Sequence, residues 1–403
     1  MIFLCKNRHS KGWISRGDLK NVLAEIRVDK EKNIDYKIGR SQAVPVDDAI
    51  ERACQGMTQA KFVWFTTTVD AFAETASKMQ ARFPQSIVMG TTSIAAFSQA
   101  GIFHDTLEVL AIASGIECVG NVLEEADRCP LKYVGRVQEA IRRLGTHRAD
   151  DTICLTATNG LISCEESVLA VLNSVLRKEN IPVFGGTAGD RGLAEKTLVS
   201  LNGKVYDKAS VFVLLRNLGG SIRLYRENIY KPICEPLTAT AVDAFHRKVM
   251  AYDGCPASEM EAKMHGLSAS QMDRSFLDSN PVGRIIGKDM YIIANDDMDT
   301  DRRTMKYHAR IYENDQIVML QPDDYRQVNR ETIQKSQREV PHPSLSIMVN
   351  CLARTLLFES EGYADEFFRS MGTALGSYVG WGGYGEQIYE QHFNQTMIAA
   401  VFE

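Results

Sequence analysis

Three observations predict a layered α/β fold, in two halves with mixed sheets and flanking helices. A strand–helix–strand pattern occurs three times, the second strand of each copy ends in glycine, and a further apolar strand closes each copy. Short apolar runs bounded by turn residues are typical of buried strands, and the stretches between them have the 3.6-residue period of helices. Strands that alternate with helices indicate helices packed on sheets.

The three copies have the same order of elements. Their first strands are "KFVWFTTT" (61–68), "DTICLTATNG" (151–160) and "SLSIMVNCLAR" (344–354). Helical stretches follow, and then the strands that end in glycine, at 86–93, 181–190 and 378–386. The closing strands lie at 107–114, 209–215 and 395–403. The period is too irregular for a solenoid, so we expect related layers within larger domains.

A different region, at about 219–343, separates the second copy from the third. It contains two strong turn signals, Asp253-Gly254 and Asn280-Pro281. A boundary near Gly219-Gly220 splits the chain into nearly equal halves. The predicted domains are therefore 1–218 and 219–403.

Charge and composition restrict the function classes. The 403 residues include 46 basic and 51 acidic side chains, with a formal net charge of −5 and no long run of one sign. A nucleic-acid surface needs concentrated Lys and Arg, so nucleic acid is not expected as the main partner. No apolar run approaches a membrane span, and "MIFLCKNRHSKGW" lacks the long apolar stretch of a signal peptide.

The nine cysteines are irregularly spaced, and no C-x-x-C occurs. This pattern is typical of reduced thiols, so we expect a cytoplasmic protein without a membrane partner. Cys154 and Cys351 lie in apolar runs and are expected to be core residues.

The segment "VFGGTAGD" (183–190) has a glycine pair at the end of a strand, which suggests a phosphate-binding loop. A P-loop needs G-x-x-x-x-G-K-[ST], and no such lysine follows Gly185. The spacing of a dinucleotide fingerprint is also wrong, and the segment leads into a predicted hairpin around Asn202-Gly203 rather than a helix. Glycine recurs at Gly90 and Gly382-Gly383, which favours a backbone reason such as close approach of another strand. A strand end of this kind also suits a ligand-pocket wall.

Catalytic motifs do not support an enzyme. The chain has no G-x-S-x-G, no H-E-x-x-H and no S-x-x-K with its companion motifs. Catalytic groups can be spread along a chain, so this lowers the odds of an enzyme rather than closing the question. A role without catalysis is expected.

Several short segments resemble, in the same order, those of the FIST family, sensory domains of intracellular signal transduction. They are "IGRSQAVPVDDAIERAC", "MGTTSIAAFSQAG", "VFGGTAGD", "VMAYDGCPASEM", "NPVGR", "IVMLQPDD", "NCLAR" and "GGYGEQIY…HFNQTM". The resemblance extends over most of the chain. It implies a FIST-N half at 1–218, a FIST-C half at 219–403, and sensing rather than catalysis.

A chain with no room for a kinase, receiver or cyclase domain is similar to the stand-alone haem-binding nitric-oxide sensors of bacteria. That likeness implies haem b held by a side chain, usually histidine, and a partner such as a histidine kinase or a cyclic-di-nucleotide signalling protein. The broader family implies instead a metal-free small ligand such as an amino acid. Both functions stay open, as does assembly into a homo-oligomer.

Haem iron needs an imidazole, thiolate or phenolate in an apolar pocket, and His246 is the first candidate. Thr240 and Asp243 resemble a capping box, which predicts that a helix starts there. His246 then follows Val242 by four positions and precedes Val249 by three, on one apolar stripe. The alternative is a core or surface histidine without a metal.

Other candidate iron ligands are weaker. His392 precedes Asn394 and Thr396, the pair that matches the closing motif of the family, so it is a candidate for the pocket wall. Cys255-Pro256, like Cys129-Pro130, resembles the thiolate haem sites of some regulatory proteins, but a turn is favoured there. His308 alternates with Lys306 and Arg310 and is expected to face solvent on a strand, and His9 and His147 are expected at the surface.

For a small polar ligand, charges and amides must be placed in an apolar cleft. The candidate charges are Arg284, Arg354 and Glu386, and Arg354 follows a strand where a carboxylate clamp can form. Neutral hydrogen bonds are expected from Asn159, Asn350, Asn394 and Thr396. Solvated or structural ion pairs are equally plausible roles for the three charges.

Overall fold

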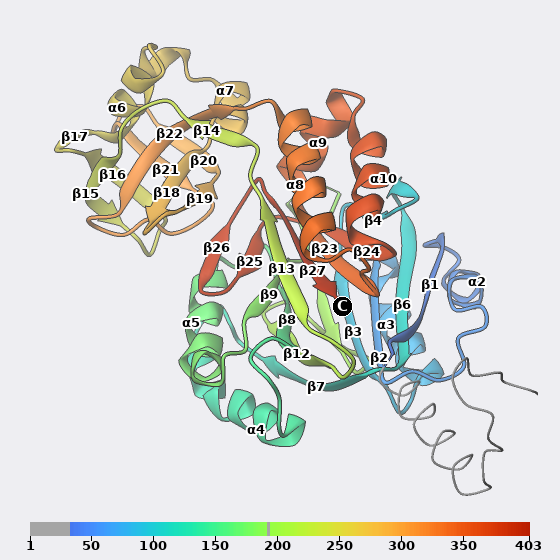
Figure 1. Cartoon of the computed structure of the whole chain (residues 1–403). Helices are drawn as coiled ribbons and strands as arrows, with labels where there is room; N and C mark the ends of the chain where they lie inside the picture. The colour runs from blue at the N-terminus through green and yellow to red at the C-terminus, as the bar shows by residue number, and fades with distance from the viewer. Residues whose placement is uncertain (1–32, 192–193) are drawn as a thin grey trace, which may run out of the picture.

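The computed structural model of the protein describes residues 33–191 and 194–403 (Figure 1). The expectations for the N-terminal segment, which concern a signal peptide and His9, lie outside the described residues. In the part of the chain that is described, no helix is long and apolar enough to cross a membrane.

Three six-stranded mixed sheets form the body of the protein. The first contains, in spatial order, β1 (Asp35–Gln42), β6 (Thr106–Ser114), β2 (Phe62–Thr67), β3 (Ile87–Thr92), β10 (Val199–Leu201) and β11 (Lys204–Tyr206). The second contains β7 (Ile116–Leu123), β12 (Ser210–Asn217), β8 (Thr152–Thr158), β9 (Val183–Thr187), β25 (Glu386–Ile388) and β26 (Gln391–Phe393). The third contains β13 (Ile222–Glu227), β27 (Met397–Phe402), β23 (Leu345–Cys351), β24 (Tyr378–Gly383), β4 (Ala96–Ser98) and β5 (Gly101–Phe103). The α/β class and the three predicted copies are therefore confirmed.

The two strands that define each copy pair in parallel. The pairs are β2 with β3, β8 with β9, and β23 with β24. Helices connect them, as parallel pairing requires. These are α3 (Val69–Arg82), α5 (Glu165–Leu176), and α9 (Leu352–Ser360) with α10 (Ala364–Leu375). Further helices are α2 (Val46–Ala53), α4 (Val134–Leu144) and α8 (Tyr325–Glu339), with short 3₁₀ helices η1 (Pro130–Tyr133) and η2 (Arg177–Glu179). Figure 1 shows α8, α9 and α10 grouped over the third sheet.

The alternation of side chains along β2 explains why both faces of a sheet are buried. Phe62 and Trp64 belong to a core cluster with side chains from all three sheets, whereas Val63 and Phe65 pack with α2 and α3. Successive side chains on a strand point to opposite faces of the sheet, so a continuous apolar run contributes side chains to the core on both faces. In the shared core, the rings of Trp64 and Trp381 lie 5.6 Å apart.

Each sheet is completed by a β-hairpin from another copy. The β10–β11 hairpin of the second copy pairs with β3, the β25–β26 hairpin of the third pairs with β9, and the β4–β5 hairpin of the first pairs with β24. This exchange is cyclic, so the three copies interlock. Strands from both sides of Gly219-Gly220 share the second and third sheets, and the division at 218/219 stays a prediction.

The glycines of "VFGGTAGD" lie where ends of the interlocked strands meet. A Cβ at Gly186 would lie 2.7 Å from Val349 Cγ1, and one at Gly189 would lie 2.7 Å from Gly382 O. Residues larger than glycine therefore collide with a neighbouring strand end. The chain continues into the predicted β10–β11 hairpin, which confirms the backbone interpretation of these glycines.

A separate β domain is inserted between β13 and α8. Its sheet runs β19 (Asp289–Ile293), β18 (Val282–Ile286), β22 (Gln316–Pro322), β15 (Leu237–Asp243), β16 (Lys248–Tyr252), β21 (Thr304–Tyr307) and β20 (Asn295–Asp299). β14 (Tyr230–Pro232) and β17 (Cys255–Pro256) pair at its sides, and α6 (Ala257–Met264), η3 (Ala269–Gln271) and α7 (Arg274–Ser279) cover it. The domain has its own apolar core and projects from the body at the upper left of Figure 1.

The predicted helix at Thr240–Val249 is wrong, because this segment forms the β15–β16 hairpin. Asp243 does not cap a helix. Its carboxylate accepts a hydrogen bond from His246 N at 3.2 Å and closes the hairpin turn, in which Arg247 has φ 57°. Asp side chains cap helices and close turns with the same short-range hydrogen bond. His246 consequently lies on an exposed turn and not on an apolar helical stripe.

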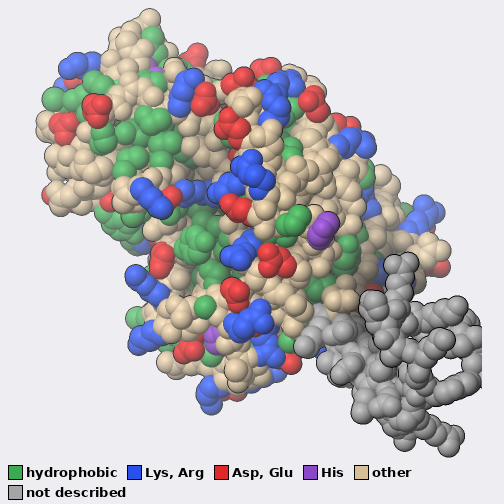
Figure 2. Space-filling view, in the orientation of Figure 1, with side chains coloured by type: hydrophobic (Ala, Val, Ile, Leu, Met, Phe, Trp, Pro, Cys, Tyr) green, Lys and Arg blue, Asp and Glu red, His purple; other side chains and the backbone are tan. Residues whose placement is uncertain are grey.

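Figure 2 shows that Lys and Arg side chains are interspersed with Asp and Glu on the visible face of the molecule. No broad region of one sign covers this face. The absence of a nucleic-acid partner stays a prediction.

Candidate ligand-binding site

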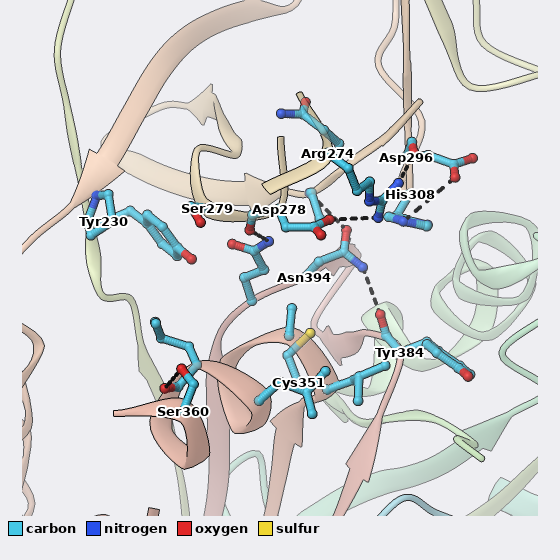
Figure 3. Close-up of a pocket in the computed structure, with 18 of the residues that line it drawn as sticks. Tyr230, Arg274, Asp278, Ser279, Asp296, His308, Cys351, Ser360, Tyr384 and Asn394 are labelled. Carbon is cyan, nitrogen blue, oxygen red and sulfur yellow. Dashed lines mark hydrogen bonds and ion pairs between the residues drawn. The ribbon is translucent and has the colours of Figure 1, made fainter. Parts of the chain in front are cut away.

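A cavity of about 740 Å³ lies between the β domain and the third copy (Figure 3). A volume of this size is typical of small-molecule sites. One wall is the start of α9, with Leu352, Ala353, Leu356 and Leu357. The facing wall comes from the β domain and includes Arg274, Asp278, Asn295, Asp296 and His308, and the loop between β26 and β27 joins the two walls.

The joining loop consists of Asn394, Gln395 and Thr396, all three buried. Asn394 Oδ1 accepts from Ala294 N in the β domain at 3.3 Å, and its Nδ2 donates to Tyr384 O in the body at 3.0 Å. Its amide therefore ties the two walls together. Gln395 has φ 52°, a left-handed conformation that few residues other than glycine adopt.

Gln395 lines the cavity and carries a buried, unpaired acceptor. The residue is 2% exposed, and Nε2 donates to Asp278 O at 2.9 Å, which sets the orientation of the amide. Oε1 has no hydrogen-bond partner among the described residues. A buried acceptor without a partner costs about 1–3 kcal/mol.

Charged groups gather at one end of the cavity. Figure 3 shows Arg274, Asp278, Asp296 and His308 at this end. Arg274 Nη2 lies 2.7 Å from Asp278 Oδ1, and its Nη1 donates to Asp296 O at 2.5 Å. Lys306 Nζ lies 2.6 Å from Asp296 Oδ2. The cations at this end are therefore already paired with protein carboxylates.

The opposite end is apolar. Leu352, Leu356 and Leu357 line it from α9, and Figure 3 shows the Tyr230 ring on its other side and Cys351 at its base. Burial raises the pKa of the Cys351 thiol and of the Tyr230 phenol well above their usual ranges. Both groups stay protonated at neutral pH, so this end carries no charge from them.

The structure brings three of the predicted ligand-binding residues together. Asn394 lines the cavity, and Thr396 lies directly after Gln395 in the joining loop. Thr396 Oγ1 donates to Glu386 Oε2 at 2.7 Å, and its backbone N donates to the same oxygen at 3.2 Å. Glu386 is completely buried, and this burial raises its pKa to about 8 although the bonds from Thr396 act to lower it. Thr396 and Glu386 support the loop from behind.

The two predicted arginines lie outside the cavity. Arg354 is completely buried, forms an ion pair with Glu227, and stacks over the rings of Phe358 and Phe367. Arg284 donates to Arg310 O at 2.8 Å and to Gln391 Oε1 at 2.6 Å.

Two predicted amides also bond within the protein: Asn159 donates to Thr197 O and Asn350 to Thr355 Oγ1. Like the two arginines, they hold the fold through internal contacts.

The predicted iron ligands do not fit a haem. The side chain of His246 is 63% exposed, and its Nδ1 lies 2.7 Å from Asp243 Oδ2. It lines a second cavity, of about 680 Å³, whose walls carry the charged residues Arg128, Arg247, Lys248, Lys306 and Arg310. Haem needs an apolar, partly closed pocket. His392 is a buried residue of β26 and Cys255 is exposed in β17, and neither lines these two cavities. Within residues 33–191 and 194–403, no group of three or more His, Cys, Asp or Glu could hold a metal ion.

Sequence reasoning missed several cavity residues. His308 is exposed, as expected, but it lies just after β21, which ends at Tyr307, and it also lines both cavities. Gln395 stands between the predicted Asn394 and Thr396, and this position was the one signal for it in the sequence. Cys351 was expected in the core and is buried, but it also lines the cavity.

The fold is that of an α/β protein in which three interlocked copies carry an inserted β domain, with a cavity between this domain and α9. Residues 61–254 match the model of the FIST N domain, and residues 257–389 match that of the FIST C domain. The chain belongs to the FIST family, whose domains have a sensory role in signal transduction. No curated protein matches the chain. The boundary between the two matched ranges lies inside the β domain, between β16 and α6.

Proposed function

We propose that this protein is a sensor that binds a small, metal-free ligand in the cavity between α9 and the β domain. The observation that carries the proposal is the cavity of about 740 Å³ itself, which has charged groups at one end and the leucines of α9 at the other. A concave site that combines an apolar wall with a few placed polar groups is typical of small-molecule binding sites.

The ligand would act on the position of the β domain relative to the body. Asn394 bonds both parts, and Gln395 Nε2 holds Asp278 of the β domain. A ligand that contacts both walls stabilises the arrangement in which they are closest. A partner protein that distinguishes the two arrangements then receives the signal. A histidine kinase or a cyclic-di-nucleotide signalling protein is the proposed partner, on the basis of family resemblance, and the role proposed for this chain is binding without catalysis in the cytoplasm.

The haem-dependent nitric-oxide sensor stays a prediction from the resemblance. His246 is exposed on a turn, and the cavity that it lines is charged. The hydrogen-bonding groups of the larger cavity favour the metal-free ligand instead.

A cavity-filling substitution tests the proposal. Ala353→Phe places a ring into the cavity from the first turn of α9, so it should abolish binding of small molecules retained by the wild type. Ala81→Phe is the matched control, because Ala81 is an exposed alanine near the end of α3. Native mass spectrometry of the purified full chain against a metabolite library measures the binding. Equal retention by the wild type, Ala353→Phe and Ala81→Phe would place the ligand elsewhere and contradict the proposal.

A further inference from the structure

The β domain meets the body at two contacts of different kinds. The first is apolar: Ile292, Val318 and Leu320 of the β domain belong to a core cluster with side chains of α9, α10 and β27. The chain enters the β domain after β13 and leaves it before α8, and Ile229 at the first crossing belongs to the same cluster. The two crossings are bonded to each other, since Asp323 N donates to Ile229 O at 2.9 Å. We call this apolar contact with its paired crossings the pivot.

The second contact, with the first turn of α5, is made by charges. Arg247 lies in the turn of the β15–β16 hairpin, and its Nη2 lies 2.6 Å from Glu165 Oε2 and 2.9 Å from Glu166 Oε2. Its Nη1 donates to His308 O at 2.7 Å, which fixes the orientation of the guanidinium within the β domain. The Arg310 N–H donates to Glu166 Oε1 at 2.7 Å. We call Arg247, Glu165 and Glu166 the latch.

The latch is buried. The side chains of Arg247, Glu165 and Glu166 are 9%, 3% and 12% exposed. Burial acts to raise the pKa of Glu166, but the charge of Arg247, with smaller effects such as the Arg310 N–H, holds this pKa below its usual value. The carboxylate is therefore ionised at neutral pH. A buried ion pair has lost the hydration of both partners, which offsets much of its attraction. The closed latch consequently adds little net stability while it is intact.

The pivot and the latch lie in different parts of the β-domain sheet. In spatial order, β19, β18 and β22 come first and carry the residues of the pivot, whereas β15, β16 and β21 follow and include the hairpin of Arg247. Relative motion is expected between domains whose interface is polar, and hinge closure uses a few residues at the crossings. A β domain with an apolar contact on one side and a charged contact on the other can rotate about the first when the second opens.

We infer that the latch is a conformational switch: while it is closed, the β domain is held against α5, and its release lets the domain rotate about the pivot. This inference rests on the proposed function in one respect, that movement of the β domain is the signal. The β domain carries both Arg247 and one wall of the larger cavity. A ligand that contacts both walls of this cavity therefore favours the closed latch.

The chain offers a natural pair of labelling sites for a distance measurement. Cys129 in the body and Cys255 in β17 are both exposed, so a nitroxide spin label can be attached to each. Cys5, Cys118 and Cys234 are replaced by Ser to restrict labelling to this pair. Double electron–electron resonance on the full chain, without added ligand, then reports the position of the β domain relative to the body.

Arg247→Met should change the distance between the labels, because it leaves two neighbouring buried carboxylates without their cation. An open arrangement that is at most about 10% of the wild type should become the main population, at a longer distance. Arg354→Met is the matched control, because it also breaks a buried pair with a glutamate, but both partners belong to the body. It should lower the stability and leave the distance unchanged.

Circular dichroism verifies that the variants fold. If Arg247→Met does not fold, Glu166→Gln takes its place, because it keeps the volume and removes one charge of the latch, and it should also increase the open population. A distance distribution equal to that of the wild type in the folded latch variant would overturn the inference. An equal change in Arg354→Met would overturn it as well, because the effect would then reflect a general loss of stability.

The outcomes separate the latch from the proposed function. If the latch variant opens while Ala353→Phe changes no binding, the latch is correct and the proposed ligand site is wrong. If binding depends on Ala353 while the latch variant stays closed, the ligand site is correct and the latch is wrong.

Discussion

Thr396 Oγ1 donates to Glu386 Oε2 at 2.7 Å in a buried contact directly behind the residue that carries the unpaired acceptor. Glu386 is protonated in the folded protein at neutral pH, because burial raises its pKa to about 8. The joining loop is therefore bonded to a carboxyl group that burial keeps protonated, although the bonds from Thr396 act to lower its pKa.

The first prediction concerns this pH dependence. Between the ordinary pKa of a glutamate, about 4.3, and about 8, the folded state keeps a proton on Glu386 that the unfolded state has lost. The contribution of Glu386 to stability is thus complete at low pH and is lost as the pH rises towards 8. In this pH range, titration of Glu386 lowers the unfolding free energy of the wild type by up to about 1.4 kcal/mol for each pH unit. Glu386→Gln cannot titrate, so its unfolding free energy should fall less steeply with pH by that amount. Urea denaturation from pH 5 to pH 8 measures it. Exposed Glu361→Gln is the control, and an unchanged slope in Glu386→Gln would contradict the prediction.

The second prediction concerns Arg354, which the sequence suggested as a ligand clamp. Arg354→Met should destabilise the protein by about 3–5 kcal/mol, because it leaves Glu227 as an uncompensated charge in the core. The double variant with Glu227→Met should recover much of this loss, since no buried charge remains. Equilibrium urea unfolding measures both. A stable Arg354→Met protein that has lost ligand binding would instead support the clamp.

The third prediction concerns the strand-end glycines. Gly186→Ala should destabilise the protein by about 1–3 kcal/mol, because the added methyl lies 2.7 Å from Val349 Cγ1 and 2.9 Å from Gly385 O. Gly135→Ala is the control: no atom lies within 4 Å of a Cβ there, and in helix α4 the change should stabilise by about 0.5–1 kcal/mol. Thermal melts of both variants measure the difference. Equal melting temperatures would show that the strand ends accommodate a Cβ at position 186, and would contradict the prediction.

The fourth prediction concerns haem. Titration of the purified protein with haem should give no stoichiometric Soret band that depends on His246, because this histidine is exposed beside charged walls. The spectra of the wild type and His246→Ala should therefore coincide. A stoichiometric band that shifts with nitric oxide and is lost in His246→Ala would establish the haem sensor and overturn the metal-free proposal.

Local patterns predicted much of the fold. The three copies could be predicted because buried strands and amphipathic helices each have a characteristic pattern of apolar residues, and this pattern is contained in residues that are neighbours in the sequence. The Asn202-Gly203 hairpin was visible because the turn requires positive φ at both residues, which are 51° and 78°. The helix at Thr240–Val249 failed because the hydrogen bond of Asp243 has the same short range in a cap and in a turn.

The site was predicted less well than the fold. Asn394 and Thr396 were predicted because they match the closing motif of the family, and Glu386 because it is a charge in a segment that also matches. Gln395 was missed, because its partner Asp278, whose carbonyl sets the orientation of the amide, lies more than a hundred residues away. Arg354 was misjudged for the same kind of reason, since Glu227 is equally distant.

The sequence by itself therefore determined the repeated strand–helix–strand copies, the family, and the glycines at the strand ends, because each is recorded in residues that are neighbours along the chain. Only the tertiary structure decided that the copies exchange hairpins in a cycle and that the β domain meets α9 across a cavity. It also decided which polar atoms remain unpaired there. These properties depend on distances between segments far apart in the chain, and neither local periodicity nor local hydrogen bonding encodes such distances.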